Sequence, residues 1–152
     1  MTVPLLIAFG LMGVTVLLHA LGTLETIVYL SRVSRQKTAR PKTLASELQI
    51  VHLVGVLLLL HLLEAGVWAA FLLAAGTLPD FETAVYFSLT SYTTVGYGDV
   101  VLPAPWRILG PMEAAVGVLM LGWSTGILVT AIPRIYRSRL QLQNDDSEAT
   151  GA

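Results

Sequence analysis

Long apolar stretches alternate with shorter polar ones along the chain. Three apolar stretches run from about Val3 to Leu30, from Glu47 to Ala75 and from Arg107 to Ile132. Each is long enough to cross about 30 Å of hydrocarbon as a helix, which takes about 20 residues. The first stretch lacks a basic start and a small-residue cleavage site, so we expect a retained helix rather than a signal peptide. The pattern predicts an all-α membrane protein with three transmembrane helices.

A shorter stretch, from Pro79 to Pro105, separates the second and third apolar segments and is too polar to span a membrane. Asp80 is placed to cap a helix of about three turns that reads TAVYFSLTSY after its first residues. The chain must then return through residues 93–99, whose two glycines permit positive φ but hold neither a helix nor a paired strand. Non-helical backbone at membrane depth is tolerated only inside protein or beside a wet cavity. We therefore expect a re-entrant helix and a filter-like loop whose carbonyls face a cation.

Composition and charge agree with a membrane protein and predict its orientation. Of the 152 residues, 55% are hydrophobic and 12% are charged, whereas a soluble domain carries about 25% charged residues. Five basic residues and no acidic residue follow the first apolar stretch, namely Arg32, Arg35, Lys37, Arg40 and Lys42. Three arginines follow the third stretch, namely Arg134, Arg137 and Arg139. Short cytoplasmic loops collect Lys and Arg. We therefore expect a multi-pass protein of the cell membrane, with the N-terminus outside and the C-terminus cytoplasmic.

The polar stretch also contains a known motif. Residues Thr94 to Asp99 read T-V-G-Y-G-D, which matches the selectivity filter of potassium channels. The surrounding order of outer helix, pore helix, filter and inner helix resembles that family's pore module from about Ile50 to Ile132, and such context makes a motif match specific. Together with the hydropathy pattern, this predicts an additional N-terminal transmembrane helix at 1–31, a basic cytoplasmic loop at 32–46, the pore module at 47–135, and a short, disordered cytoplasmic tail at 136–152.

The resemblance further implies a function. Members of the family form tetramers in which rings of backbone carbonyls replace the water around a dehydrated K⁺ ion. In this chain K⁺ would be coordinated by Thr94, Val95, Gly96 and Tyr97, with Gly98 completing the filter. The resemblance thus implies a non-enzymatic, potassium-selective channel subunit that forms a homotetramer in membrane lipid. It implies K⁺ as the permeant ion, no organic cofactor and no nucleic-acid partner. A non-selective cation channel on the same scaffold is the alternative.

Four positions are expected to support the filter, namely Tyr86, Thr90, Thr93 and Asp99. Some bacterial members of the family have a glutamate four positions before the filter threonine, and it pairs with the aspartate after the filter. Thr90 occupies that position here. We therefore expect Asp99 to be held by Tyr86, which stands where the family often has an aromatic donor, or by a water. Glu113 either replaces the missing carboxylate or reaches the membrane interface.

Glycines interrupt the third apolar segment at Gly117, Gly122 and Gly126. Small residues let membrane helices approach closely, which is one interpretation of these positions. The other is that Gly117 or Gly122 forms the gating hinge that family members place in this helix. Pro133 is expected to stop or kink the helix at its cytoplasmic end.

Histidines and acids in the apolar segments raise a competing chemistry. His61 and Glu64 are spaced i, i+3, and His19, Glu25 and His52 lie at other membrane positions. Paired Glu and His sets on facing helices bind metals in bundles, but such sites use two pairs and this chain has one. A hydrogen-bonded and pH-responsive His61–Glu64 pair is therefore preferred over a membrane metalloenzyme. A non-conducting partner with a relic filter is a third class, disfavoured because every filter position is intact.

Overall fold

The computed structural model describes the backbone of residues 2–35 and 42–150, and it is helical over most of that length. Side chains are described for residues 2–29, 31 and 47–137. The elements, in chain order, are α1 (Thr2–Arg35), α2 (Lys42–Ala74), α3 (Phe81–Tyr92), the single 3₁₀ turn η1 (Trp106–Ile108) and α4 (Leu109–Thr150). Within these described ranges there is no strand, which confirms the predicted all-α class.

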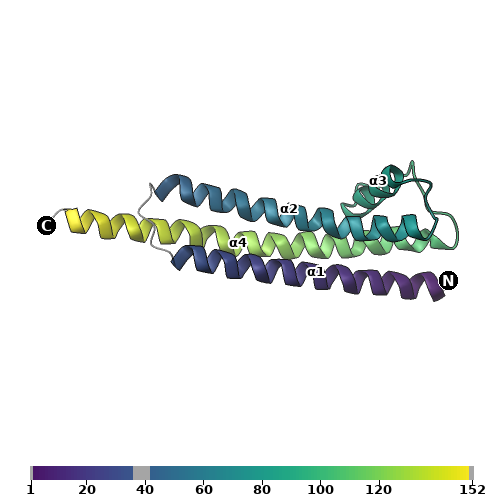
Figure 1. Ribbon diagram of the computed structural model, residues 1–152, viewed down its shortest axis with the longest axis horizontal. Coiled ribbons are helices and arrows are strands. Elements are labelled where there is room, and N and C mark those ends of the chain that lie inside the picture. Colours follow the sequence, from purple (N-terminus) through teal and green to yellow (C-terminus); the bar gives the residue numbers. More distant parts are fainter. Residues whose placement is uncertain (1, 36–41, 151–152) are drawn as a thin grey trace.

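Three helices run side by side along the length of the molecule, and the fourth is short (Figure 1). α1, α2 and α4 contain the apolar segments of membrane length, at Thr2–Tyr29, Glu47–Ala74 and Trp106–Arg137. The short helix α3 packs against α2 and α4 at the end of the bundle where the chain begins, and α4 ends far away at the opposite end. The three predicted transmembrane helices and the shorter helix between the second and third are therefore confirmed.

The first helix buries a polar face and exposes an apolar one. Thr15, His19, Thr23 and Thr26 are almost fully buried against the rest of the bundle, at helical spacings of three and four. Leu6 and Leu17, by contrast, are 71% and 60% exposed. Because lipid is as apolar as a leucine side chain, membrane helices associate through packing and hydrogen bonds rather than through hydrophobic burial. This distribution fits a helix whose outer face contacts lipid.

The best-packed part of the bundle surrounds the short helix. Trp68 and Leu72 of α2, Tyr92 of α3, and Leu109 and Val116 of α4 are all fully buried there. α3 thus enters between α2 and α4 and ends inside the protein rather than crossing it, as expected for a re-entrant helix.

The helices extend further than the sequence suggested. α1 continues to Arg35 and α2 begins at Lys42, so only residues 36–41 of the expected basic loop lie outside the described part of the chain. α4 continues through Pro133 and stays helical to Thr150, where the sequence led us to expect disorder after residue 136. Residues 134–143 contain three Arg, two Leu and two Gln, which propagate a helix well once it has begun. The division of the chain into an additional N-terminal helix, a basic loop, a pore module and a tail remains a prediction.

Candidate functional site

The short helix starts where the sequence placed its cap. Asp80 has an extended backbone (φ −152°), and its carboxylate accepts hydrogen bonds from the Thr83 backbone N–H at 2.8 Å and from the Thr83 hydroxyl at 3.0 Å. The bond from the Thr83 backbone lowers the pKa of Asp80 below its usual value, followed in weight by the bond from the hydroxyl. Asp80 therefore stays ionised at the N-terminus of α3, where negative charge is favoured by the helix dipole.

Backbone hydrogen bonds connect the loop after α3 to the last turn of that helix. Thr93 N–H and Thr94 N–H still donate to Leu89 O and Ser91 O, at 3.1 and 2.9 Å, and Gly96 N–H donates to Thr90 O at 3.0 Å. These bonds fold the beginning of the loop back against the last turn of the helix. Residues 95–97 then have no regular secondary structure.

The backbone of this loop alternates in handedness. Thr94, Gly96 and Gly98 have positive φ of 64°, 49° and 80°, whereas the intervening Val95 and Tyr97 do not. Alternation of this kind rotates successive peptide groups so that their N–H groups gather on one side and their carbonyls on the other. Glycine adopts positive φ without a steric penalty. Thr94 adopts it at a cost, because a β-branched residue with positive φ is strained by about 1–3 kcal/mol. Strain of this kind is typical of functional sites.

The side chains of the loop lie at the surface of the chain. All residues from 93 to 99 are exposed, and Val95 and Tyr97 are 51% and 72% exposed. A Cβ built on Gly96 or Gly98 meets nothing within 4 Å. Their positive φ, and not a lack of space within the chain, is therefore what favours glycine at both positions.

The aspartate after the loop is held by the expected tyrosine. Tyr86 Oη donates to Asp99 Oδ2 at 2.6 Å, and Asp99 Oδ1 accepts from the Val100 backbone N–H at 3.0 Å. The bond from Tyr86 is the main reason why the pKa of Asp99 lies below its usual value, and the same bond raises the pKa of Tyr86. The hydroxyl of Thr90 instead bonds carbonyls of its own helix, those of Tyr86 and Phe87, both at 3.0 Å. Thr90 does not stand in for the missing glutamate.

Glu113 is buried and does not reach an interface within the described chain. Its side chain has no exposed surface, and both of its carboxyl oxygens lack a hydrogen-bond partner, as does the hydroxyl of Ser88 in α3. The alternative in which Glu113 reaches the membrane interface is therefore wrong. The carboxyl group lies behind the pore helix, but it makes no contact with Asp99 that would replace the missing clamp.

The two candidate hinge glycines differ sharply. A Cβ on Gly117 would lie 2.0 Å from the carbonyl oxygen of Tyr92, whereas a Cβ on Gly122 meets nothing within 4 Å. Gly117 thus lets α4 touch the backbone at the end of α3, which is the close-packing role that the sequence left open. The hinge remains a prediction, and Gly122 is the position better suited to it.

The fold and the loop together agree with the comparison with known families. The model of a family described as "Ion channel" matches residues 56–134, just over half of the chain. The chain belongs to this ion-channel family. The matched region of the channel runs from α2 through α3 and the loop to α4, which is the region over which the resemblance was recognised. The prediction of a non-enzymatic membrane channel is confirmed.

A curated relative points in the same direction. The channel is 37% identical over 74 residues to a protein named potassium voltage-gated channel protein shk-1, from Caenorhabditis elegans. The alignment covers 48% of the channel described here and 14% of the worm protein. No solved structure matches the chain significantly.

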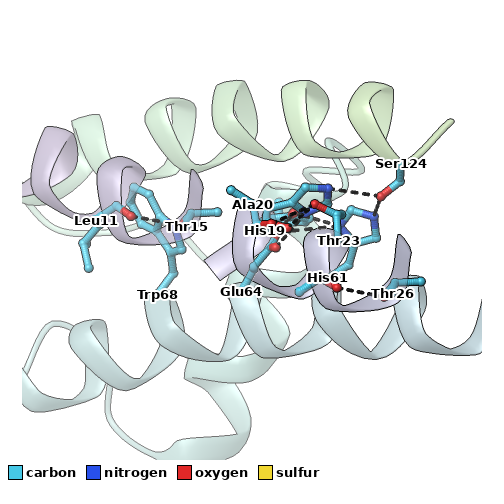
Figure 2. A network of polar contacts seen from close by, with 12 residues as sticks. Leu11, Thr15, His19, Ala20, Thr23, Thr26, His61, Glu64, Trp68 and Ser124 are labelled. Carbon is cyan, nitrogen blue, oxygen red and sulfur yellow. Dashed lines mark hydrogen bonds and ion pairs between the residues drawn. The ribbon is translucent and has the colours of Figure 1, made fainter. Parts of the chain in front are cut away.

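Sequence reasoning missed a buried polar cluster beside the end of the pore helix (Figure 2). Glu64 accepts from Tyr92 Oη and lies 2.8 Å from His19 Nδ1. His61 Nδ1 is 3.6 Å from Glu64 Oε2, so the predicted pair is in close contact, at an ion-pair distance slightly longer than a hydrogen bond. His61 also contacts Tyr92 Oη at 2.9 Å and Ser124 Oγ at 3.0 Å. Helical spacing showed that His61 and Glu64 share a face, but it could not show which residues of other helices complete the cluster.

Proposed function

We propose that four copies of this channel subunit assemble around a common axis and conduct K⁺ selectively through the loop of residues 94–98. The observation that carries the proposal is the positive φ at Thr94, Gly96 and Gly98, from which we infer that the carbonyls of the four residues 94–97 face one side. One chain supplies one wall of such a filter. A closed ring of carbonyls around an ion requires symmetric copies, and fourfold symmetry is the arrangement that the motif implies.

The exposed side chains of the loop and of α4 support the assembly. Tyr97 in the loop and Val118, Leu119 and Trp123 on α4 are large apolar groups at the surface of the single chain. In a tetramer the neighbouring subunits would cover them. Each α3 would then direct the partial negative charge of its C-terminal end, about half an elementary charge, towards the axis below the filter, where it favours a cation.

We further propose the orientation expected from the charges. The start of α1 lies at the same end of the bundle as α3 and the loop, and the end of α4 lies at the other (Figure 1). If the filter end faces outwards, the N-terminus is outside the cell membrane and Arg134 and Arg137 are on the cytoplasmic side.

Reconstitution into liposomes tests the proposal. Under a K⁺/Na⁺ gradient the reversal potential should approach the K⁺ equilibrium value, and Ba²⁺ should block the flux. Gly96→Ala should abolish the selective flux because alanine disfavours the positive φ at this position, whereas Gly13→Ala, in α1 with nothing within 4 Å of the added Cβ, serves as the matched control. A reversal potential near zero would favour the non-selective cation channel. A dimeric purified protein would refute the shared filter.

A further inference from the structure

The polar cluster beside the filter is a closed ring of five side chains. Going round it, Glu64 contacts His19, His19 Nε2 contacts Ser124 Oγ at 3.4 Å, and Ser124 contacts His61. His61 then contacts Tyr92, and Tyr92 donates back to Glu64. Figure 2 shows Ser124 of α4 bonded to both imidazoles, which come from different helices. The four α-helices α1, α2, α3 and α4 therefore meet in this ring, because each contributes a member.

The number of hydrogens in the ring follows from its chemistry. Each of the five contacts needs one hydrogen between its two polar atoms. Tyr92 and Ser124 bring one hydroxyl hydrogen each, and each neutral histidine brings one N–H. These groups supply four hydrogens, so the fifth contact lacks one as long as Glu64 is a carboxylate. One additional proton, held on His19 or on Glu64, completes all five contacts and makes the ring neutral.

Burial strengthens this conclusion. Glu64 and His19 have no exposed surface, and Ser124 and Tyr92 are almost fully buried. Without the additional proton the ring would carry a net charge of −1 in the membrane interior and one contact between two lone pairs, both of which are costly in a low dielectric. The other titratable group that acts on Tyr92 is Glu113 of α4, which is itself an acid and brings no compensating positive charge.

We propose that this ring is a binding site for one proton, and that its occupancy controls the conducting state of the filter. The second half of the proposal rests on the proposed function. Tyr92 is the last residue of α3, directly before the loop, and its carbonyl group packs against Gly117 of α4. When the proton is bound, five contacts fix Tyr92 between α2 and α4. When it leaves, one contact is lost and the end of the pore helix is released.

The substitution Glu64→Gln is a sharp test because glutamine completes the ring without a proton. Its amide N–H donates to His19 Nδ1, and its carbonyl accepts from Tyr92, so all five contacts are formed at every pH. This variant should fold, assemble and hold the filter in its proton-bound arrangement. His52→Gln is the matched control, since His52 lies on the same helix α2 but is exposed and contacts Tyr29.

Two measurements on the full-length protein in liposomes decide the question. The ¹⁵N spectrum of labelled histidines, of which the chain has 3, should change in one step as the ring gains or loses its proton, and this step should be absent in Glu64→Gln. K⁺ flux should fall as pH rises through the same step, about tenfold for each further pH unit. It should stay at its low-pH value in Glu64→Gln and follow the unmodified protein in His52→Gln.

The possible results separate the two halves of the proposal from the proposed function. A histidine step that persists in Glu64→Gln as in the unmodified protein would overturn the proton site. So would a step that appears only with added Zn²⁺ and vanishes with a chelator, in this case in favour of a metal bound by His19, His61 and Glu64. A pH-dependent flux that persists in Glu64→Gln would overturn the link to the filter. A protein without any K⁺ flux would contradict the proposed function, and the imidazole titration would still decide whether the ring holds a proton.

Discussion

Replacement of Gly117 by alanine should destabilise the channel by disturbing the end of the pore helix. The new Cβ would lie 2.0 Å from the Tyr92 carbonyl oxygen and 2.9 Å from its carbonyl carbon, and real Cβ contacts stay above about 3.0 Å. The obstacle is backbone rather than a flexible side chain, so α3 and α4 must separate by about 1 Å. Overpacking of this kind costs about 1–3 kcal/mol and sometimes more, against roughly 1 kcal/mol gained when alanine replaces glycine in a helix.

The matched variant is Gly122→Ala, one turn and a half further along the same helix. Its Cβ meets nothing within 4 Å in the chain, so only the helix-propensity gain of up to about 1 kcal/mol applies. The midpoint of thermal unfolding in detergent should therefore fall for Gly117→Ala and stay or rise for Gly122→Ala. Equal stability of the two variants would refute the close contact. A Gly117→Ala protein of normal stability but altered opening would show instead that this glycine is the hinge.

Two other contacts make simpler predictions. Tyr86→Phe removes the bond that lowers the pKa of Asp99. Because a lowered pKa stabilises the folded loop only above that pKa, acid-induced loss of flux should begin at a higher pH in Tyr86→Phe, and an unchanged acid midpoint would contradict this. Thr15→Val removes the acceptor of the Trp68 indole N–H, a 3.0 Å bond that joins α1 to α2. It should lower the free energy of unfolding by about 1 kcal/mol, measured as a lower thermal midpoint, whereas Thr15→Ser should not.

The elements of the fold that follow local rules could be predicted from the sequence. Hydropathy located the three membrane helices because each must satisfy its own backbone in lipid, and Asp80 marked the start of α3 because a helix N-terminus needs an acceptor. The loop of residues 94–98 was recognisable because few backbones require glycine at alternate positions. The bond between Tyr86 and Asp99 was anticipated only as one of two possibilities, since the sequence does not give the distance between residues 13 positions apart.

Contacts between helices could not be predicted in the same way. Helical spacing placed His61 and Glu64 on one face of α2, yet the actual partners of Glu64 come from α1 and α3. The rotation of each helix about its own axis decides these partners, and a helix that is apolar nearly all round leaves that rotation undetermined. The helical continuation of α4 was missed for another reason, since composition predicts disorder without regard to a helix that already precedes the segment.

The polar face of α1 explains how an additional helix can belong to the pore rather than merely lie beside it. In lipid, apolar packing alone discriminates poorly between neighbouring helices, so position and rotation must be specified by the few polar groups. α1 meets α2 through two such contacts along one face, Thr15 with Trp68 and His19 with Glu64. The second contact also supplies the partner of a fully buried carboxylate. Removing one partner of such a pair leaves a buried charge uncompensated, which costs far more than the pair itself contributes. In this chain α1 therefore supplies one of the partners of the buried carboxylate of Glu64 in α2, beside Tyr92 of α3.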